Sequence, residues 1–285
     1  MPGNACDPTF VGNAVIVSLG SSKALARRLF PRAYETVQVH KMGRELATEG
    51  SVWAQNALSD AVLSAVIRRS LSLTSTAIDI GAAHGRFARE MAHVARRGSV
   101  LAIEPVPTLN AQLKRIFRSK GHVSVLPYAV GQENKQTDFW ICDSNVGLSG
   151  LAATHAARQS GTVQAITVPV RTLDSITAGF ASIDLIKIDV EGGEYDVLCG
   201  AEDTLSTHHP IIAFECTSHA DEYENSPNDV FELLARQDYE VFPPTGYLRG
   251  TQPLSQEYFL ESINGGHEIF FFAQHPSEPS GRSTR

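Results

Sequence analysis

Charged side chains interrupt an apolar run in the segment IDLIKIDVEGGEYDVLCGAE, residues 183–202. The apolar residues predict a parallel strand that is covered on both faces. Lys187, Asp189 and Glu191 stand at alternate positions, so an extended backbone would point all three to one side. Burying three ionisable groups is costly unless they are paired or the strand opens into a cleft. We therefore expect Asp189 and Glu191 at a cleft, with Lys187 as their ion-pair partner.

A glycine-containing turn follows an earlier apolar run, in the segment DIGAAHG. Asp79 ends that run, and Gly81 and Gly85 stand on either side of the turn into a helical pattern. Glycine allows tight bends and a close approach of the backbone to a ligand. A dinucleotide fingerprint, G-x-G-x-x-G, would need glycine where Ala83 stands. Asp79 suits instead a ligand with a cationic amino group. The alternative is a generic strand-to-helix turn, which would have the same pattern.

Glu104 ends the next predicted strand, in the segment AIEPVP. A carboxylate at this position can accept hydrogen bonds from both hydroxyls of a ribose. Asp79 and Glu104 together fit S-adenosylmethionine better than NAD, with the methionine ammonium near Asp79 and the adenine near the end of the third strand. The predicted cofactor-binding residues are Asp79, Gly81, Ala82, Gly85, Glu104, Pro105, Tyr128, Ala129 and Asp189.

Alternating strand and helix patterns must position these residues. Strands are predicted at residues 76–80, 99–105, 123–131, 183–190 and 211–216, and two more between 231 and 275. This order predicts an α/β fold with a mostly parallel sheet and helices on both faces, in which ligands bind at the carboxyl ends of the strands. We divide the chain into a mainly helical N-terminal extension (1–75), with helices in 22–47 and 51–71, an α/β domain (76–275) and a disordered tail (276–285).

The segments AIDIGAAHG, AIEPVPTLNAQLKRIF, LPYAVG, NVGLSGL, VRTLDSI and above all IDLIKIDVEGGEYDVLCGA resemble the FkbM family of S-adenosylmethionine-dependent methyltransferases. The resemblance covers about residues 76–215. It implies a Rossmann-like class I methyltransferase fold, with a seven-stranded sheet whose last strand is antiparallel. It also implies methyl transfer to a hydroxyl oxygen of a small molecule, sugar or glycolipid. His84 departs from the family pattern, which more often has a small or amide-bearing residue there.

About fifty residues separate the third and fourth predicted strands, more than a short connection needs. We interpret residues 136–175 as two added strands and a polar, glycine-containing loop that lie over the cleft; a plain surface excursion is the alternative. Asn145, Ser149 and His155 are the polar residues of this insertion that we single out for contact with the methyl acceptor.

Methyl transfer to a hydroxyl group needs an aligned acceptor oxygen and a group that removes its proton. The candidate bases follow the fourth and fifth predicted strands: Asp189, Glu191, Glu215 and His219. Neighbouring carboxylates raise one another's pKa, which suits a base that works near neutral pH. Mg²⁺ held by Asp189 and Glu215 is an alternative, because oxygen ligands suit this ion. The fifth strand supplies a single carboxylate, so we expect no bound metal.

The composition of the chain limits the classes of binding partner that we expect. The chain has 285 residues and a formal net charge of −7, without a concentrated basic stripe, so nucleic acid is not an expected partner. The four cysteines are scattered and no apolar run is long enough to span a membrane, so we expect a cytoplasmic protein. Apolar helical faces in residues 1–75 have no evident place on the sheet, and they favour a homodimer. An NAD(P)-dependent oxidoreductase and a non-catalytic methyltransferase-like binding protein are the alternative functions.

Overall fold

The computed structural model describes residues 52–142, 149–152, 158–159, 161–217, 225–266 and 268–276. Seven strands form the large central sheet in the order β3-β2-β1-β7-β8-β10-β9. Their bounds are β1 (Thr76–Ile80), β2 (Ser99–Ile103), β3 (Val123–Leu126), β7 (Leu185–Ile188), β8 (Ile211–Glu215), β9 (Glu240–Phe242) and β10 (Phe270–Gln274). β10 is antiparallel to both of its neighbours. The other pairings are parallel, so the predicted mostly parallel sheet with an antiparallel last strand is confirmed.

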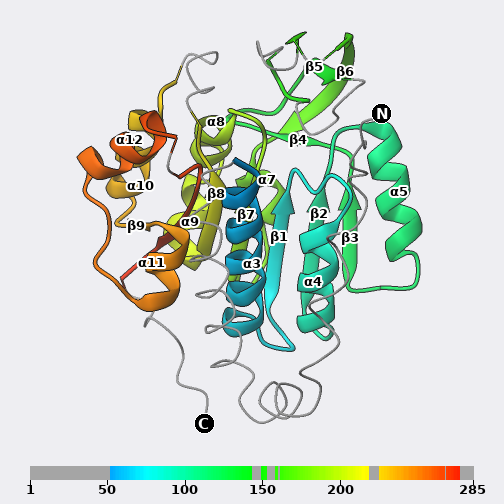
Figure 1. The fold of residues 1–285 in the computed structure, drawn as a ribbon. Helices are drawn as coiled ribbons and strands as arrows, with labels where there is room; N and C mark the ends of the chain where they lie inside the picture. The colour runs from blue at the N-terminus through cyan, green and yellow to red at the C-terminus, as the bar shows by residue number, and fades with distance from the viewer. Residues whose placement is uncertain are drawn as a thin grey trace, which may run out of the picture.

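Helices cover both faces of this sheet (Figure 1). One face packs against α3 (Val52–Ser70), α4 (Arg86–Val94), α5 (Pro107–Phe117) and α11 (Pro244–Arg249). The other packs against α7 (Leu173–Thr177), α8 (Glu194–Cys199), α9 (Glu202–His208), α10 (Pro227–Arg236) and α12 (Gln256–Asn264). The short helices α11 and α12 stand between β9 and β10, where the sequence analysis predicts no helix.

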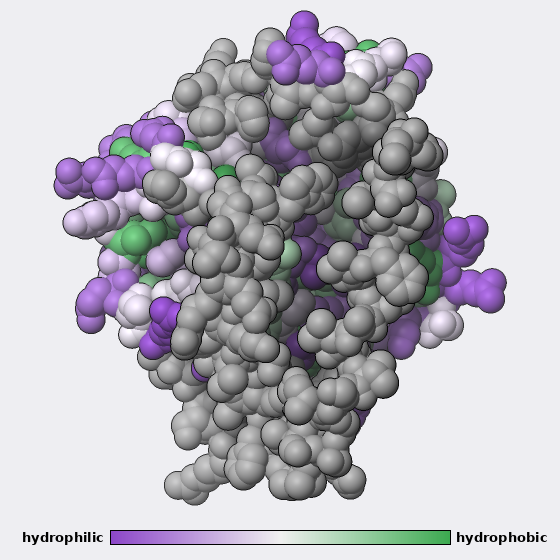
Figure 2. Space-filling view, in the orientation of Figure 1, coloured by the Kyte–Doolittle hydropathy of each residue, from purple (hydrophilic) through white to green (hydrophobic). Residues whose placement is uncertain are grey.

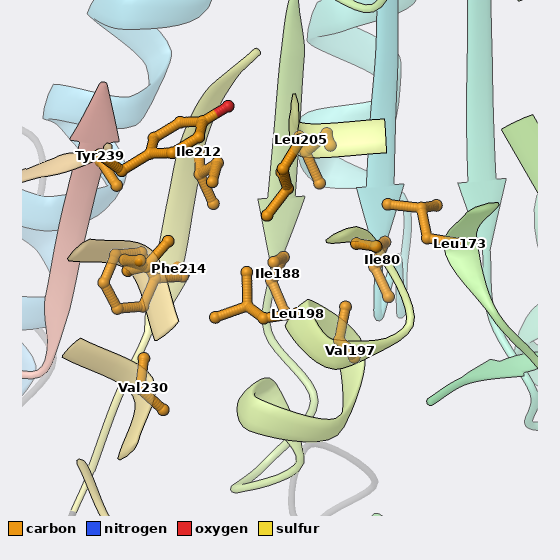
Figure 3. Close-up of a cluster of buried hydrophobic side chains, with 14 of the residues drawn as sticks. Ile80, Leu173, Ile188, Val197, Leu198, Leu205, Ile212, Phe214, Val230 and Tyr239 are labelled. Atoms are coloured by element: carbon orange, nitrogen blue, oxygen red, sulfur yellow. The ribbon is translucent and has the colours of Figure 1, made fainter. Parts of the chain in front are cut away.

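Strand alternation divides the core into two layers. In β1, Ala77 joins the cluster under α3 and α4, whereas Ile78 and Ile80 join the cluster under α8 and α10. Figure 3 shows the second cluster, in which Ile188 of β7 and Phe214 of β8 lie near side chains of α8. The same alternation puts Lys187 of β7 on the α3–α4 side, between Asp79 of β1 and Ala213 of β8.

The helix predicted for residues 51–71 is observed as α3, and the earlier prediction, 22–47, lies outside the described residues. In α3, the apolar side chains are buried in the cluster under α4: Val62, Leu63, Val66 and Ile67. Ser64 Oγ donates a hydrogen bond to Glu90 Oε2 of α4 (2.7 Å). The apolar face of α3 therefore packs within the chain, and this helix no longer supports the argument for a dimer. The tail predicted to be disordered lies outside the description from residue 277 onward.

A three-stranded sheet, β4-β6-β5, lies at one end of the large sheet (Figure 1). The antiparallel pair β5 (Lys135–Cys142) and β6 (Val163–Arg171) matches the two strands predicted in the insertion. The single third strand predicted for residues 123–131 is wrong. It breaks after Leu126, and β4 (Ala129–Val130) pairs with β6 instead. Pro127 stands at the break, where it has no N–H to donate to a strand ladder.

On the face drawn in Figure 2, hydrophilic side chains predominate along the margins, with smaller apolar areas among them. No helix in the described part of the chain combines the length and the hydropathy that crossing a membrane requires.

Candidate active site

A cavity opens where the carboxyl ends of β1, β2 and β7 meet the small sheet. Its polar side chains are Glu104, Ser149, Asp189 and Glu191. Tyr128 and Phe139 contribute aromatic wall, and the other lining residues are mostly apolar or glycine: Ile80, Gly81, Ala83, Pro105, Val106, Leu109, Ala129, Val130, Leu151, Val190 and Gly193. A cavity with apolar walls and a few convergent polar groups is the usual form of a small-molecule site.

The turn after β1 uses three left-handed residues: Gly81 (φ 72°), Ala83 (φ 45°) and Gly85 (φ 74°). A Cβ at Gly81 would lie 1.8 Å from the carbonyl oxygen of Asp189, so only glycine fits where this turn passes the end of β7. The amides of Gly81 and Ala82 both donate to the carbonyl of Ile103 at 3.0 Å. The turn is thereby fixed against β2 and β7 while Gly81 and Ala83 face the cavity.

Glu104 presents a fixed carboxylate at the tip of β2. Its Oε2 accepts a hydrogen bond from the amide of Ala83 (2.8 Å), and its Oε1 accepts one from the amide of Val106 (2.9 Å). Burial raises its pKa, and these two amides act in the opposite direction. The side chain lines the cavity although the residue is 4% exposed, so the free lone pairs of its oxygens are available to a bound group.

Lys187 connects the glycine turn after β1 with the carboxylate that follows β7. It is 3% exposed, and its Nζ lies 3.0 Å from the carbonyl oxygen of Gly81, 3.1 Å from Asp189 Oδ2 and 3.4 Å from Asp79 Oδ1. Burial lowers the pKa of Lys187, but the Asp189 and Asp79 carboxylates outweigh burial and leave that pKa raised. The predicted ion-pair role of Lys187 is therefore confirmed, with Asp79 as an additional partner.

The Asp189 carboxylate faces the cavity in its ionised form. Burial raises its pKa, but the Lys187 ammonium outweighs burial and the net shift is downward. The predicted upward shift of the candidate bases is therefore wrong for Asp189, because the predicted effect of neighbouring carboxylates is outweighed there by Lys187. Its side chain is 36% exposed, unlike that of Lys187, so the penalty for burying its charge is partial. An ionised carboxylate that is accessible from the cavity is able to accept a proton from a bound molecule.

Asp79 does not line the cavity. It is 1% exposed, and its Oδ2 accepts a hydrogen bond from the amide of Ala88 in α4 (2.9 Å). Burial raises its pKa, although Lys187 acts against this. Ala82 and Gly85 shape the turn without lining the cavity, and the predicted residues that line it are Gly81, Glu104, Pro105, Tyr128, Ala129, Asp189 and Glu191.

Three carboxylates meet beside the cavity: one oxygen from each of Asp189, Glu191 and Glu215 lies within 4.8 Å of the others. Burial raises the pKa of Glu191 to about 8, with contributions from Asp189 and Glu194. Burial and the neighbouring charges of Asp189 and Glu191 hold the pKa of Glu215 well above its usual value. A hydrogen bond joins the Glu215 and Asp189 side chains, and it favours the protonated form of Glu215 and the ionised form of Asp189. His219 lies outside the described residues.

Glu194 supports this group, and the sequence analysis does not predict it as a site residue. Its Oε1 accepts hydrogen bonds from the amides of Val190 (3.2 Å) and Gly192 (3.3 Å). These bonds flank Glu191, which has φ 58° although it is not glycine. Glu194 directly follows the glycine pair 192–193 and stands in the first turn of α8. This position is the sequence signal that could have identified Glu194 as a site residue.

The insertion supplies one cavity residue that the sequence analysis does not predict, Phe139, and one that it singles out, Ser149. Phe139 of β5 lines the cavity and packs with Val106 and Leu109, which flank the start of α5. Ser149 also lines the cavity, and its Oγ accepts a hydrogen bond from the amide of Cys142 (3.0 Å). The other two polar residues singled out in the insertion, at positions 145 and 155, lie outside the described residues. The sequence pattern of β5 does not indicate that Phe139 faces the cavity. β5 pairs with the nearby strand β6, and its position against the start of α5 depends on tertiary contacts.

Comparison with known proteins adds independent evidence. Residues 79–241 match the model of the methyltransferase FkbM domain. Over 141 residues the chain is 26% identical to the 2-O-methyltransferase NoeI of Sinorhizobium fredii (strain NBRC 101917 / NGR234). This match covers 45% of the chain and 58% of that protein, so the chain spans less than two thirds of the length of this relative.

Two solved structures are also similar. The FkbM methyltransferase of Methylobacillus flagellatus KT gives a TM-score of 0.46 at 15% identity, covering 89% of this chain and 60% of that chain. Fibrillarin of Aeropyrum pernix in complex with natively bound S-adenosyl-L-methionine gives 0.39 at 9% identity, covering 72% and 68%. Both TM-scores are below 0.5, so the family assignment depends on the domain match, which spans more than half of the chain. The chain belongs to the FkbM methyltransferase family.

Proposed function

We propose that this protein is an S-adenosylmethionine-dependent O-methyltransferase that methylates a hydroxyl group of a small molecule, sugar or glycolipid. One observation carries the proposal. Glu104 and Asp189, on the tips of two strands that flank β1, line the same cavity beside the glycine turn. The first is a fixed hydrogen-bond acceptor and the second an ionised carboxylate that can receive a proton.

The cavity residues fit the cofactor. Glu104 would accept the ribose hydroxyls, because each of its oxygens keeps a lone pair beyond its amide partner. Gly81 would allow the methionine portion to approach the backbone, since the turn has no side chain there. Pro105, Tyr128 and Ala129 would form the adenine wall. When bound, the cofactor supplies a methyl group on a sulfonium leaving group.

Asp189 is the proposed general base. It would take the proton of the acceptor hydroxyl as the oxygen attacks, and Lys187 keeps it ionised for this role. The hydrogen bond with Glu215 orients the Asp189 carboxylate. Glu191 and His219 stay alternative bases, with Ser149 as a candidate contact to the acceptor. Close alignment of two bound reactants supplies much of the rate increase that such an enzyme needs.

Transfer to oxygen is supported by the relative described as a 2-O-methyltransferase, at 26% identity. We also propose a cytoplasmic location and no nucleic-acid partner, from the cysteine distribution and the net charge of −7. A homodimer is proposed from the apolar helical pattern predicted for residues 22–47. We expect no metal requirement, because Lys187 already supplies positive charge to Asp189. Turnover that EDTA abolishes and Mg²⁺ restores would overturn this point.

Calorimetry with S-adenosylhomocysteine and with NAD tests the cofactor. We expect binding of the first and none of the second; the reverse would indicate the alternative oxidoreductase. Transfer of a labelled methyl group from S-adenosylmethionine to a panel of sugars, glycolipids and hydroxylated metabolites then tests the reaction. Product labelled on nitrogen or carbon would refute transfer to oxygen, and binding without transfer to any acceptor would favour the non-catalytic alternative.

Substitution of the proposed base tests the mechanism. Asp189→Asn should lower kcat by about 10²- to 10⁴-fold, the usual contribution of a general base, with little change in S-adenosylhomocysteine affinity. Asp203→Asn is the matched control, because Asp203 is an exposed aspartate of α9. Equal losses of kcat and affinity in Asp189→Asn would indicate a structural role for Asp189.

A further inference from the structure

The buried ammonium of Lys187 has three oxygen neighbours: it donates a hydrogen bond to one of them and forms ion pairs with the other two. These oxygens come from three parts of the site: the Gly81 carbonyl in the glycine turn, the Asp189 carboxylate after β7 and the Asp79 carboxylate within β1. Asp79 in turn accepts a hydrogen bond from the first turn of α4. A single cation therefore joins the turn on the cofactor side to the carboxylate on the acceptor side.

The surroundings make a charged pair here unnecessary for packing. Lys187 faces the same core layer as Ala77, Leu185 and Ala213, all of which are fully buried and apolar. Replacing a buried ion pair by apolar residues of similar volume is often neutral or stabilising. The feature that apolar residues would not reproduce is the link between Gly81 and Asp189.

We propose that Lys187 is a positioning residue, which fixes the distance between the glycine turn and the Asp189 carboxylate and so aligns the two bound reactants. This inference depends on the proposed function, because it assigns the cofactor to the turn and the acceptor proton to Asp189. Lys187 does not line the cavity, and it acts through Gly81 and Asp189, which do.

The charge around Lys187 agrees with this role. In the described part of the chain, the ionisable groups that interact with it or with its partners are acidic: Asp79, Glu104, Asp189, Glu191, Glu194 and Glu215. The Lys187 ammonium attracts the carboxylates of Asp79 and Asp189 from two neighbouring strands. Without it, the Asp189 carboxylate would lose the ammonium that connects it to the Gly81 carbonyl of the turn.

The paired variant Lys187→Met with Asp79→Asn tests the proposal, since it removes the cation together with its buried partner and leaves an oxygen for the amide of Ala88. We expect kcat to fall about 100-fold, the effect of a displacement of roughly 1 Å between reacting groups. We also expect the dissociation constant of S-adenosylhomocysteine to rise several-fold in calorimetry, with a smaller change in the KM of the acceptor. Lys114→Met, an exposed lysine of α5, is the matched control.

A cycle with Asp189→Asn distinguishes positioning from general destabilisation. If Lys187 acts through Asp189, adding the paired variant to Asp189→Asn should lower kcat no further, whereas a purely structural loss would multiply with that of Asp189→Asn. Multiplying losses, or unchanged kcat in the paired variant, would overturn the proposal. Should the paired variant fail to fold, Lys187→Arg serves in the same cycle, because a planar guanidinium cannot satisfy the same three acceptors. Failure of the wild-type protein to bind S-adenosylhomocysteine would instead refute the proposed function.

Discussion

Asp79 and Lys187 occupy facing positions on the adjacent parallel strands β1 and β7, and Asp79 Oδ1 lies 3.4 Å from Lys187 Nζ. Both side chains are almost completely buried. Asp79 Oδ1 has no hydrogen bond, so the ammonium is its close polar neighbour. The position that sequence reasoning assigned to the cofactor ammonium is therefore taken, from inside the protein, by an ammonium of the chain itself.

Removing one member of this pair should destabilise the fold. Asp79→Ala leaves the buried Lys187 with Asp189 as its remaining carboxylate partner and deprives the amide of Ala88 of its acceptor. Breaking a buried ion pair in this way costs about 3–5 kcal/mol of unfolding free energy. Urea denaturation measures the loss. Asp138→Ala, at an exposed position of β5, should change stability by no more than about 0.5 kcal/mol; a similar small change in Asp79→Ala would contradict the prediction.

Glu104→Gln should weaken cofactor binding more than it weakens the fold. An amide keeps one oxygen for a backbone donor but loses the negative charge and the second acceptor. Hydrogen bonds to charged groups contribute about 1.5–3 kcal/mol, so the dissociation constant of S-adenosylhomocysteine should rise by about 10- to 100-fold. Calorimetry measures this, with the exposed Glu133→Gln as the control. Unchanged affinity would exclude the assigned ribose contact.

Gly81→Ala should disrupt the site from within the backbone. A left-handed alanine costs about 1–2 kcal/mol by itself, and the new Cβ would overlap the carbonyl oxygen of Asp189 at 1.8 Å. We expect the free energy of unfolding to fall by more than about 2 kcal/mol. Thermal or urea denaturation measures this loss. Gly121→Ala is the control, because a Cβ there would meet nothing within 4 Å. Equal stability of the two variants would show that the turn relaxes without cost.

Stability should fall as the pH rises from about 4.5 to 8. The folded-state pKa of Glu191 is raised to about 8 and that of Glu194 to about 7, from a usual 4.5. A raised pKa means that the folded state holds its proton more tightly, so this contribution is complete below pH 4.5 and is lost as pH rises through the folded values. Asp189, whose pKa is lowered, loses its contribution only at more acidic pH.

Thermal unfolding midpoints between pH 4.5 and 9 measure this dependence. Glu191→Gln should flatten the decline, because glutamine stays uncharged throughout. Glu261→Gln, at an exposed position of α12, should leave the decline as in the wild-type protein. A wild-type midpoint that rises toward pH 8 would contradict the assigned direction of the shifts.

Much of the site could be predicted from the sequence, because local patterns carry it. The apolar run before Asp189 predicted a strand, and parallel strands place their carboxyl ends along one edge. That rule places Glu104, Asp189 and Glu191 near each other, as observed around the cavity. The glycines of DIGAAHG predicted a tight turn, and the left-handed angles of Gly81 and Gly85 follow from the lack of a Cβ.

The tertiary structure decided which side chains pair with which. Strand adjacency is not written in either strand, so the sequence could not show that β7 inserts next to β1 and brings Lys187 opposite Asp79. This pairing moves Asp79 from the predicted cofactor contact to a buried support. The docking of β5 against α5, which brings Phe139 to the cavity, likewise depends on packing between distant segments. The sequence thus determined the chemical groups at the strand ends, whereas long-range packing decided which of them face the cavity and which lie beneath it.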